Sequence, residues 1–363
     1  MADEHILQLI ELDPTNSQVS QPHADQIQLL ITCLSRVIEE QSGRDHLEQA
    51  RHLGQLCREA AEGRGDLREE AAAIIADLDD DRIVSLLRSY TAMFHLLNHS
   101  EKQEIVRINR ERSRASTIES PRSESIDEAI GELKAMGLTE DEVLALVARM
   151  DIQPTLTAHP TEARRRSILF KQQAIAAVLG RIRDCDLTPS EEEDSLAEIQ
   201  NQIALMFATD EVRSSRMRVE TEVEHGLYFI RNAVWETLPK IQADIRRALR
   251  RHYGIEVDLQ PAVRVRSWIG SDRDGNPFVT PDITRYTASF LRDTALSMYF
   301  SELRELRREL SLSDRQTPTP EILTDSLERE KTEIALPELV LQLYAGEPYR
   351  LKISYMMARV RHL

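Results

Sequence analysis

LTAHPTEARRRSIL, residues 156–169, is the stretch on which the fold prediction depends. It begins inside PTLTA (154–158), a short β-prone run bounded by proline, for which we expect a buried strand that leads into His159. From Pro160 onward the pattern becomes helical, through EARRRSILFKQQAIAAVLGRI. One histidine and three consecutive arginines therefore follow the end of a strand, in a chain whose formal net charge is −16.

The three arginines, Arg164, Arg165 and Arg166, are expected in the first turns of this helix. Free backbone N–H groups and the helix dipole favour an anion there, and guanidinium groups bind phosphate oxygens in pairs. A lone histidine is more often structural than catalytic, but this positive charge favours an anion-binding role for the segment. Because consecutive helical residues cannot share a face, at least one arginine is expected to be merely exposed.

A second segment has the same plan of strand, polar loop and helix. PAVRVRSWI (261–269) alternates valine and arginine, and it runs directly into the turn-rich loop GSDRDGNPFVT (270–280). In parallel α/β barrels the chemistry lies at the C-terminal ends of the strands. We therefore expect His159 at one strand end, and four polar residues at another: Asp272, Arg273, Asp274 and Asn276.

The spacing of Asp272, Asp274 and Asn276 is also that of the first ligands of a calcium loop. The rest of that pattern fails, because Pro277 replaces the required glycine and Ile283 stands where the bidentate glutamate belongs. A loop whose acids hold Arg273 and neighbouring arginines in position accounts for these residues better.

The remainder of the chain is predicted to be mainly helical. Apolar stripes at helical spacing predict core-facing helices in the first 110 residues: Ile27, Leu30, Ile31, Leu34 and Ile38; Leu47, Ala50, Leu53 and Cys57; Ile83, Leu86, Leu87, Tyr90, Phe94 and Leu97. The serine-rich stretch 113–126 predicts a mobile surface loop, followed by a helix that ends at Gly137. Capping pairs predict the starts of two further helices: Thr139 with Glu142, and Ser190 with Glu193.

Composition excludes several classes of protein. No run approaches the roughly 18 apolar residues of a membrane span, and the acidic N-terminus has no secretory signal. The net charge of −16 argues against general binding to nucleic acid or to anionic membranes. Three scattered cysteines, Cys33, Cys57 and Cys185, are expected to be reduced core thiols in a cytoplasmic protein. Sequence motifs for nucleotide-binding glycine loops, zinc proteases, paired cysteines and serine hydrolases are absent.

Five segments, in the same order, resemble those of phosphoenolpyruvate carboxylase. LTAHPTEARRRSIL and SWIGSDRDGNPFVT (267–280) resemble the two N-terminal signature segments of that family. FATDEVR (207–213), HGLYFIRNAVWETLP (225–239) and EPYRLKISYMMARV (347–360) resemble three further segments. The chain departs from the family pattern at Phe207, which is usually tryptophan, and at Ser271, which is usually glycine.

The resemblance implies a largely helical enzyme built around a distorted (β/α)8 barrel. Residues 1–150 would form an N-terminal helical region, and residues 151–363 would supply the first barrel strands with long helices around them. Family members are more than twice as long as this chain, so the barrel would be incomplete here. The last helical pattern stops without an end signal at Leu363, which also agrees with an N-terminal part.

The resemblance also implies a reaction, in which phosphoenolpyruvate and bicarbonate give oxaloacetate and phosphate. His159 would be catalytic, and Arg165, Arg166 and Arg273 would bind the anionic substrate, whereas Arg164 falls on a variable position. Three residues would organise the site: Asp272, Asp274 and Asn276. The ligands of Mg²⁺ or Mn²⁺ are expected further along the family's length, with none in this chain.

The family resemblance extends to the assembly and the role in the cell. The intact enzymes are tetramers that replenish the tricarboxylic acid cycle in the cytoplasm, without nucleic acid or membrane partners. We expect this chain to be inactive alone. A different class of function remains open, namely a non-catalytic helical assembly module from a truncated gene.

Overall fold

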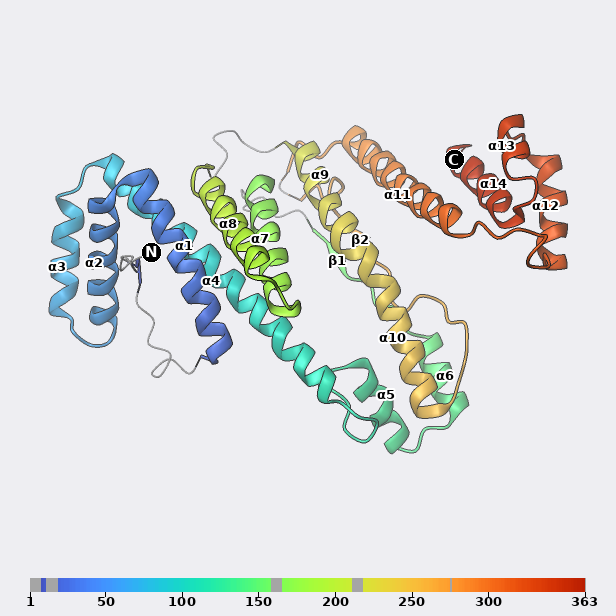
Figure 1. Ribbon diagram of the computed structural model, residues 1–363, viewed down its shortest axis with the longest axis horizontal. Coiled ribbons are helices and arrows are strands. Elements are labelled where there is room, and N and C mark those ends of the chain that lie inside the picture. Colours follow the sequence, from blue (N-terminus) through green and yellow to red (C-terminus); the bar gives the residue numbers. More distant parts are fainter. Residues whose placement is uncertain (1–7, 11–18, 158–164, 211–217, 275, 363) are drawn as a thin grey trace. The chain divides into compact units, whose positions relative to one another are not determined.

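The computed structural model describes residues 8–10, 19–157, 165–210, 218–274 and 276–362. It confirms the prediction of a mainly helical chain with a few strands (Figure 1). The chain divides into two compact units, each assembled from two separate stretches of sequence. The first unit consists of residues 1–136 and 160–216, and the second of residues 137–159 and 217–363.

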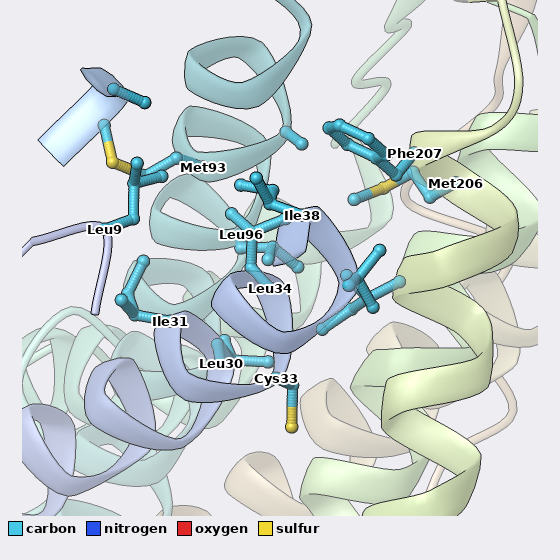
Figure 2. Packing of buried hydrophobic residues seen from close by; sticks show 14 of the residues in the cluster. Leu9, Leu30, Ile31, Cys33, Leu34, Ile38, Met93, Leu96, Met206 and Phe207 are labelled. Atoms are coloured by element: carbon cyan, nitrogen blue, oxygen red, sulfur yellow. The ribbon is translucent and has the colours of Figure 1, made fainter. Parts of the chain in front are cut away.

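The first unit is built from helices, listed here with their bounds: α1 (Gln21–Ser42), α2 (Arg44–Ala61), α3 (Asp66–Ala76), α4 (Asp80–Ala115), α5 (Ile126–Ala135), α7 (Arg166–Asp184) and α8 (Pro189–Phe207). Its core gathers buried side chains from α1, α2, α4, α7 and α8, and Figure 2 shows part of this cluster. The stripe along α1 is confirmed, because Leu30, Ile31, Leu34 and Ile38 are at most 1% exposed. Each such side chain contributes about 1.5–3 kcal/mol when it is fully buried.

Two expectations about this core were wrong in part. On α4, Leu86 is buried but Leu87 and Phe94 are exposed, because the buried face of the helix continues through Met93 and Leu96. Among the cysteines only Cys33 is buried, and burial raises the pKa of its thiol. Cys57 and Cys185 are free thiols on the surface rather than core residues.

The helix starts and the loops follow the predictions with shifts of a few residues. α4 continues to Ala115, so the irregular serine-rich segment covers only 116–125. α5 ends before Gly137, which adopts a φ of 87°. The capping box of Thr139 and Glu142 is present, with both of its hydrogen bonds.

The predicted cap at Ser190 was wrong. α8 begins after Thr188, whose hydroxyl accepts a hydrogen bond from the backbone N–H of Glu191 while the Glu191 carboxylate accepts from Thr188. Pro189 occupies the first helical position, where its missing N–H needs no partner and its fixed φ suits a helix. Ser190 is consequently already inside the helix.

The second unit contains the strands and the remaining helices, listed with their bounds: α6 (Glu140–Ala148), β1 (Thr155–Leu156), α9 (Val219–Phe229), a π-helical turn (Ile230–Val234), α10 (Trp235–Tyr253), β2 (Arg266–Ser267), α11 (Pro281–Glu309), α12 (Glu321–Glu333), α13 (Glu338–Leu343) and α14 (Pro348–His362). A small apolar cluster joins α9, α11 and the two strands, and it includes Leu227, Ile269 and Leu156. A separate cluster holds α12 against α14 through Leu327, Leu351 and Tyr355.

The two predicted strands pair with each other in parallel. Thr155 lies opposite Arg266 and Leu156 opposite Ser267, and an isolated bridge joins Ile152 to Val263. The expectation of a buried first strand was wrong, because Thr155 is exposed and Leu156 is only half-buried. In the part of the chain that the structure describes, the sheet consists of these two strands.

The alternating arginines of the second strand lie on its exposed face. Arg266 donates through Nε to Gln153 Oε1 at 3.1 Å, and Arg264 lies 3.9 Å from Asp151. These two arginines are therefore accounted for by contacts with the neighbouring strand. None of the described helices is both long and apolar enough to cross a membrane.

Candidate functional site

The parallel pairing of β1 and β2 determines where the two signature segments start. Four backbone hydrogen bonds of 2.7–2.9 Å hold the pair in register, the last from Trp268 N–H to the Leu156 carbonyl. Because the strands are parallel, both run toward the same edge. The chain after Leu156 leads to His159, and the chain after Ser267 leads to the 270–280 loop. His159 and Arg164 themselves lie outside the described residues.

The 270–280 loop is shaped by hydrogen bonds from its own polar residues. The carbonyl of Trp268 accepts from the backbone N–H groups of Ser271 and Asp272, both at 3.1 Å. The Asp272 carboxylate accepts from the N–H of Asp274 at 3.2 Å, which is an Asx turn. Asn276 repeats this arrangement, because its side-chain oxygen accepts from the N–H of Phe278 at 3.1 Å. Two of the three predicted site-organising side chains therefore fix the backbone of the loop.

Arg273 is held by one hydroxyl group near the start of α11. Its guanidinium Nη2 donates to Thr284 Oγ1 at 3.3 Å, and that hydroxyl donates to the Gly270 carbonyl at 3.1 Å. Within the described residues Arg273 forms no ion pair with Asp272 or Asp274. The acids thus shape the turn around Arg273, and the threonine fixes the guanidinium.

Two glycines allow the close packing behind this loop, and sequence reasoning did not identify either of them. Gly270 has a φ of 72°, and a Cβ there would lie 2.1 Å from Thr287 Oγ1 on α11. Gly226 on α9 faces Ile269, whose Cδ1 would lie 2.2 Å from an added Cβ. The segment after β2 is therefore packed so closely against α9 and α11 that a side chain at Gly226 or at Gly270 would force Ile269 or Thr287 to move.

Arg165 and Arg166 lie at the start of α7, in the first unit. The helix begins at Arg166, later than the sequence suggested, and Arg165 is its N-cap residue in an extended conformation. Arg165 Nη2 lies 3.6 Å from the Asp210 carboxylate, and Asp210 is 85% exposed. An ion pair this open contributes about 0–1 kcal/mol, so it leaves the guanidinium available for an anion. Arg165 Nε is buried without a hydrogen-bond partner among the described residues.

The structure therefore brings together only part of the predicted site. Asp272, Arg273, Asp274 and Asn276 share one loop of the second unit, whereas Arg165 and Arg166 belong to the first unit. Asp210 is a contact of Arg165 that sequence reasoning missed. It lies in the FATDEVR segment quoted for the resemblance, but only the fold could connect it with an arginine 45 positions earlier.

A π-helical turn, Ile230–Val234, lies between α9 and α10. Trp235 N–H bonds to the Ile230 carbonyl, five residues back, and Asn232 Nδ2 donates to the Tyr228 carbonyl at 2.8 Å. Such turns are frequent at functional sites, although no role follows from the turn alone. In the sequence, Pro239 inside α10 is the residue that indicates an irregular helix in this region. Proline lacks the backbone N–H that would donate to the carbonyl four residues back.

The described residues do not form a metal centre. No group of three or more histidine, cysteine, aspartate or glutamate side chains is placed to hold an ion in the ranges that the structure describes. The Asp272 carboxylate accepts a hydrogen bond from the Asp274 N–H through Oδ1. These residues do not fit the Mg²⁺ ion that the family resemblance implies.

The two departures from the family pattern fit their surroundings. Phe207 is 4% exposed, and the guanidinium of Arg88 lies 5.0 Å from the centre of its ring, so the position keeps an aromatic contact. Ser271 does not have a positive φ, so its backbone does not require glycine. Its hydroxyl donates to the Trp268 carbonyl at 3.0 Å and reinforces the turn.

Comparison with known proteins agrees with the resemblance seen in the sequence. The sequence profile of the family described as phosphoenolpyruvate carboxylase matches residues 24–362. A phosphoenolpyruvate carboxylase of Rhodothermus marinus is 53% identical over 355 residues, which cover 98% of this chain and 38% of that protein. A protein of the same name from Thermus thermophilus is 35% identical over 328 residues, covering 90% of this chain and 35% of the relative.

A third relative, from Roseiflexus castenholzii and also named phosphoenolpyruvate carboxylase, is 33% identical over 341 residues, or 92% of this chain and 36% of that protein. The chain thus spans little more than a third of the length of these relatives. The profile match runs through both strand-end segments and nearly the whole chain. The chain belongs to the phosphoenolpyruvate carboxylase family.

Proposed function

We propose that this chain is the N-terminal part of a phosphoenolpyruvate carboxylase, which converts phosphoenolpyruvate and bicarbonate into oxaloacetate and phosphate. The observation that carries the proposal is the parallel pairing of β1 with β2, from which both family signature segments leave at one edge. We further propose that these are early strands of a distorted (β/α)8 barrel, in which catalytic residues follow the C-terminal ends of strands. Residues 1–150 would then be the helical region, and residues 151–363 the first part of the barrel.

His159 is the proposed catalytic base. In the family reaction the phosphoryl group passes from phosphoenolpyruvate to bicarbonate, giving carboxyphosphate and the enolate of pyruvate. His159, three residues beyond β1, would accept the carboxyphosphate proton as CO2 is released, because an imidazole can take up a proton near neutral pH. The enolate carbon then attacks CO2 to form the new carbon–carbon bond of oxaloacetate.

Arg165, Arg166 and Arg273 are the proposed anion-binding residues. Every species in the reaction is anionic, so a protein with a net charge of −16 requires a local cationic pocket. The weak, exposed pair of Arg165 with Asp210 supports this role, as does the fixing of Arg273 by Thr284. Asp272, Asp274 and Asn276 organise the site by shaping the turn that presents Arg273.

The metal and the assembly belong to the intact enzyme. A bound Mg²⁺ or Mn²⁺ ion would supply electrostatic stabilisation of the transferring phosphoryl group, and we place its ligands in the part of the family's length that this chain does not span. We propose a cytoplasmic homotetramer that supplies oxaloacetate to the tricarboxylic acid cycle. Phosphoenolpyruvate and bicarbonate are its substrates, and neither nucleic acid nor a membrane is a partner.

The test is a chimera in which residues 1–363 are followed by the C-terminal part of the Rhodothermus marinus relative. We expect bicarbonate- and Mg²⁺-dependent formation of oxaloacetate. His159→Asn should lower the turnover by on the order of 10²-fold or more, with a much smaller change in KM for phosphoenolpyruvate, because proton transfer is lost rather than binding. His52→Asn, on an exposed position of α2, is the matched control and should retain full activity.

A soluble, folded chimera without turnover would favour the alternative, a helical assembly module without catalytic function. Equal activity of the His159→Asn chimera and its parent would instead remove His159 from the chemistry. Reading the coding sequence beyond Leu363 is a cheaper first step, because an open frame that continues along the family supports the enzyme.

A further inference from the structure

A surface cavity of about 530 Å³ that is wide open to solvent lies in the first unit, between the end of α4 and the loop that follows it. Six residues line it: Val106, Asn109, Arg110, Ser113, Arg114 and Arg122. The volume falls within the range of small-molecule sites. None of the residues proposed for catalysis contributes to this cavity.

The lining carries three guanidinium groups and no carboxylate. This concentration of positive charge stands out in a chain with 62 acidic and 46 basic residues. The other polar lining groups are the Ser113 hydroxyl and the Asn109 amide, both of which can donate hydrogen bonds. Forked guanidinium donors with neutral donors beside them match the oxygens of a phosphate group.

Two of the three arginines are fixed by neighbours. Arg110 pairs with the Asp184 carboxylate at the end of α7, and Arg183 binds the same carboxylate through Nε at 3.0 Å and Nη2 at 2.8 Å. One carboxylate shared by two guanidinium groups leaves a net positive charge beside the cavity. Arg122, from the loop, donates to Asn109 Oδ1 at 3.4 Å, which orients the Asn109 amide nitrogen away from Arg122.

Stabilisation of the helix end does not account for this arrangement. Arg112 and Arg114 both lie in the last turn of α4, where positive charge complements the negative end of the helix dipole. That effect needs neither Arg110, which lies a turn earlier, nor Arg122, which lies outside the helix. The dipole corresponds to about half a negative charge and disfavours an anion there, but three guanidinium groups outweigh it.

We propose that this cavity is an anion site for a phosphate group, either free inorganic phosphate or the phosphate of a small phosphorylated metabolite. Arg110, Arg114 and Arg122 bind the phosphate oxygens, and Ser113 with Asn109 supplies neutral donors. Arg114 is the most informative position, because it lines the cavity and has no side-chain partner among the described residues. The site is separate from the proposed catalytic one and does not depend on it.

The experiment measures binding to residues 1–363 by titration calorimetry at low ionic strength. The probes are inorganic phosphate, glycerol 3-phosphate and, for comparison, a short glutamate peptide. We expect a single phosphate-dependent site whose affinity falls about tenfold or more in Arg114→Ala and in Arg122→Ala, as for loss of a hydrogen bond to a charged group. Arg112→Ala removes the same charge from the same helical turn but not from the cavity, and should change the affinity less than twofold.

Tighter binding of glycerol 3-phosphate than of inorganic phosphate would support a phosphorylated metabolite, and equal binding would support the free ion. The proposal is overturned if Arg112→Ala and Arg114→Ala weaken binding equally, because the effect is then one of general charge. It is also overturned if only the glutamate peptide binds, or if no probe binds. Circular dichroism of each variant checks that the substitutions leave the fold unchanged.

Discussion

Gly270, between β2 and the signature loop, combines a left-handed backbone with the absence of space for a side chain. Gly254 has the same φ of 72° but nothing within 4 Å of an added Cβ, so it is a matched control. We expect Gly254→Ala to cost about 1–2 kcal/mol of unfolding free energy through backbone strain alone. Gly270→Ala should cost about 1–3 kcal/mol more, because Thr287 must also move. Urea denaturation of both variants measures the difference. Equal losses of unfolding free energy would show that Thr287 moves aside at no measurable cost.

Glu104 predicts a pH dependence of the stability of the first unit. Its carboxylate accepts from Arg107 at 2.6 and 2.7 Å and from Ser20 Oγ at 2.6 Å. The Arg107 hydrogen bonds, before any other cause, lower the pKa of this buried carboxyl from 4.5 to about 2. A lowered pKa in the folded state contributes stability that is fully present above pH ~4.5 and is lost as the pH falls toward ~2.

Glu104→Gln should therefore lower the unfolding free energy by about 3 kcal/mol at pH 7, as for one partner of a buried ion pair. The difference from the parent should shrink steadily between pH ~4.5 and pH ~2. Glu111→Gln removes the exposed partner of the same arginine and should have a small effect throughout. A constant difference across this pH range would show that the Glu104 charge is not the cause.

At the scale of the element, the start of α8 allows the cap predicted from the sequence, Ser190, to be compared with the cap in the structure, Thr188. Thr188→Ala should cost about 1 kcal/mol, because it leaves the Glu191 N–H without its side-chain acceptor. Ser190→Ala should be nearly neutral, since Ser190 is inside the helix. Thermal denaturation of the two variants measures both effects, and a larger loss in Ser190→Ala would contradict the observed helix start.

The sequence predicted the elements better than their surroundings. The capping box at Thr139 follows from a local pattern and is present, and the predicted segments 154–158 and 261–269 each contain a short strand, at Thr155–Leu156 and Arg266–Ser267. Their parallel pairing agrees with the expectation drawn from parallel α/β barrels. Burial of the first strand did not follow, because an apolar run does not reveal which layers cover it. The Ser190 cap failed because two overlapping pairs both satisfy the capping pattern, and only Pro189 at the first helical position decides between them.

The candidate site was predictable only as a set of residues. The family resemblance singled out His159, the paired arginines and the 270–280 loop, but the contacts that shape them come from distant positions. Thr284 and Thr287 on α11 and Gly226 on α9 fix the loop, and each belongs to a helix that looks ordinary in the sequence. Such contacts depend on how the helices pack, which no local pattern records.

For the whole molecule, we expect no carboxylase activity from purified residues 1–363. The chain spans 38% of the length of its Rhodothermus marinus relative, so a site built from residues along the whole family length would be incomplete in it. The strand pair also has exposed aromatic side chains near its end, Trp268 and Phe278, which favour association. Oxaloacetate assays with light scattering should show no turnover and a species above 41.6 kDa. Turnover by a clean monomer that is lost in His159→Asn would contradict this expectation.

The pairing of β1 with β2 also has a consequence for the synthesis of the chain. Leu156 and Ser267 are 111 positions apart, and between them lie α7 and α8, which complete the other unit. At about 5–20 residues per second, the first strand leaves the ribosome roughly 6–20 s before its partner exists. During that interval the first unit can close around its own core, while the β1 segment remains an unpaired strand. The β1 segment, which leads to His159, therefore has no strand partner in the nascent chain until β2 has been synthesised.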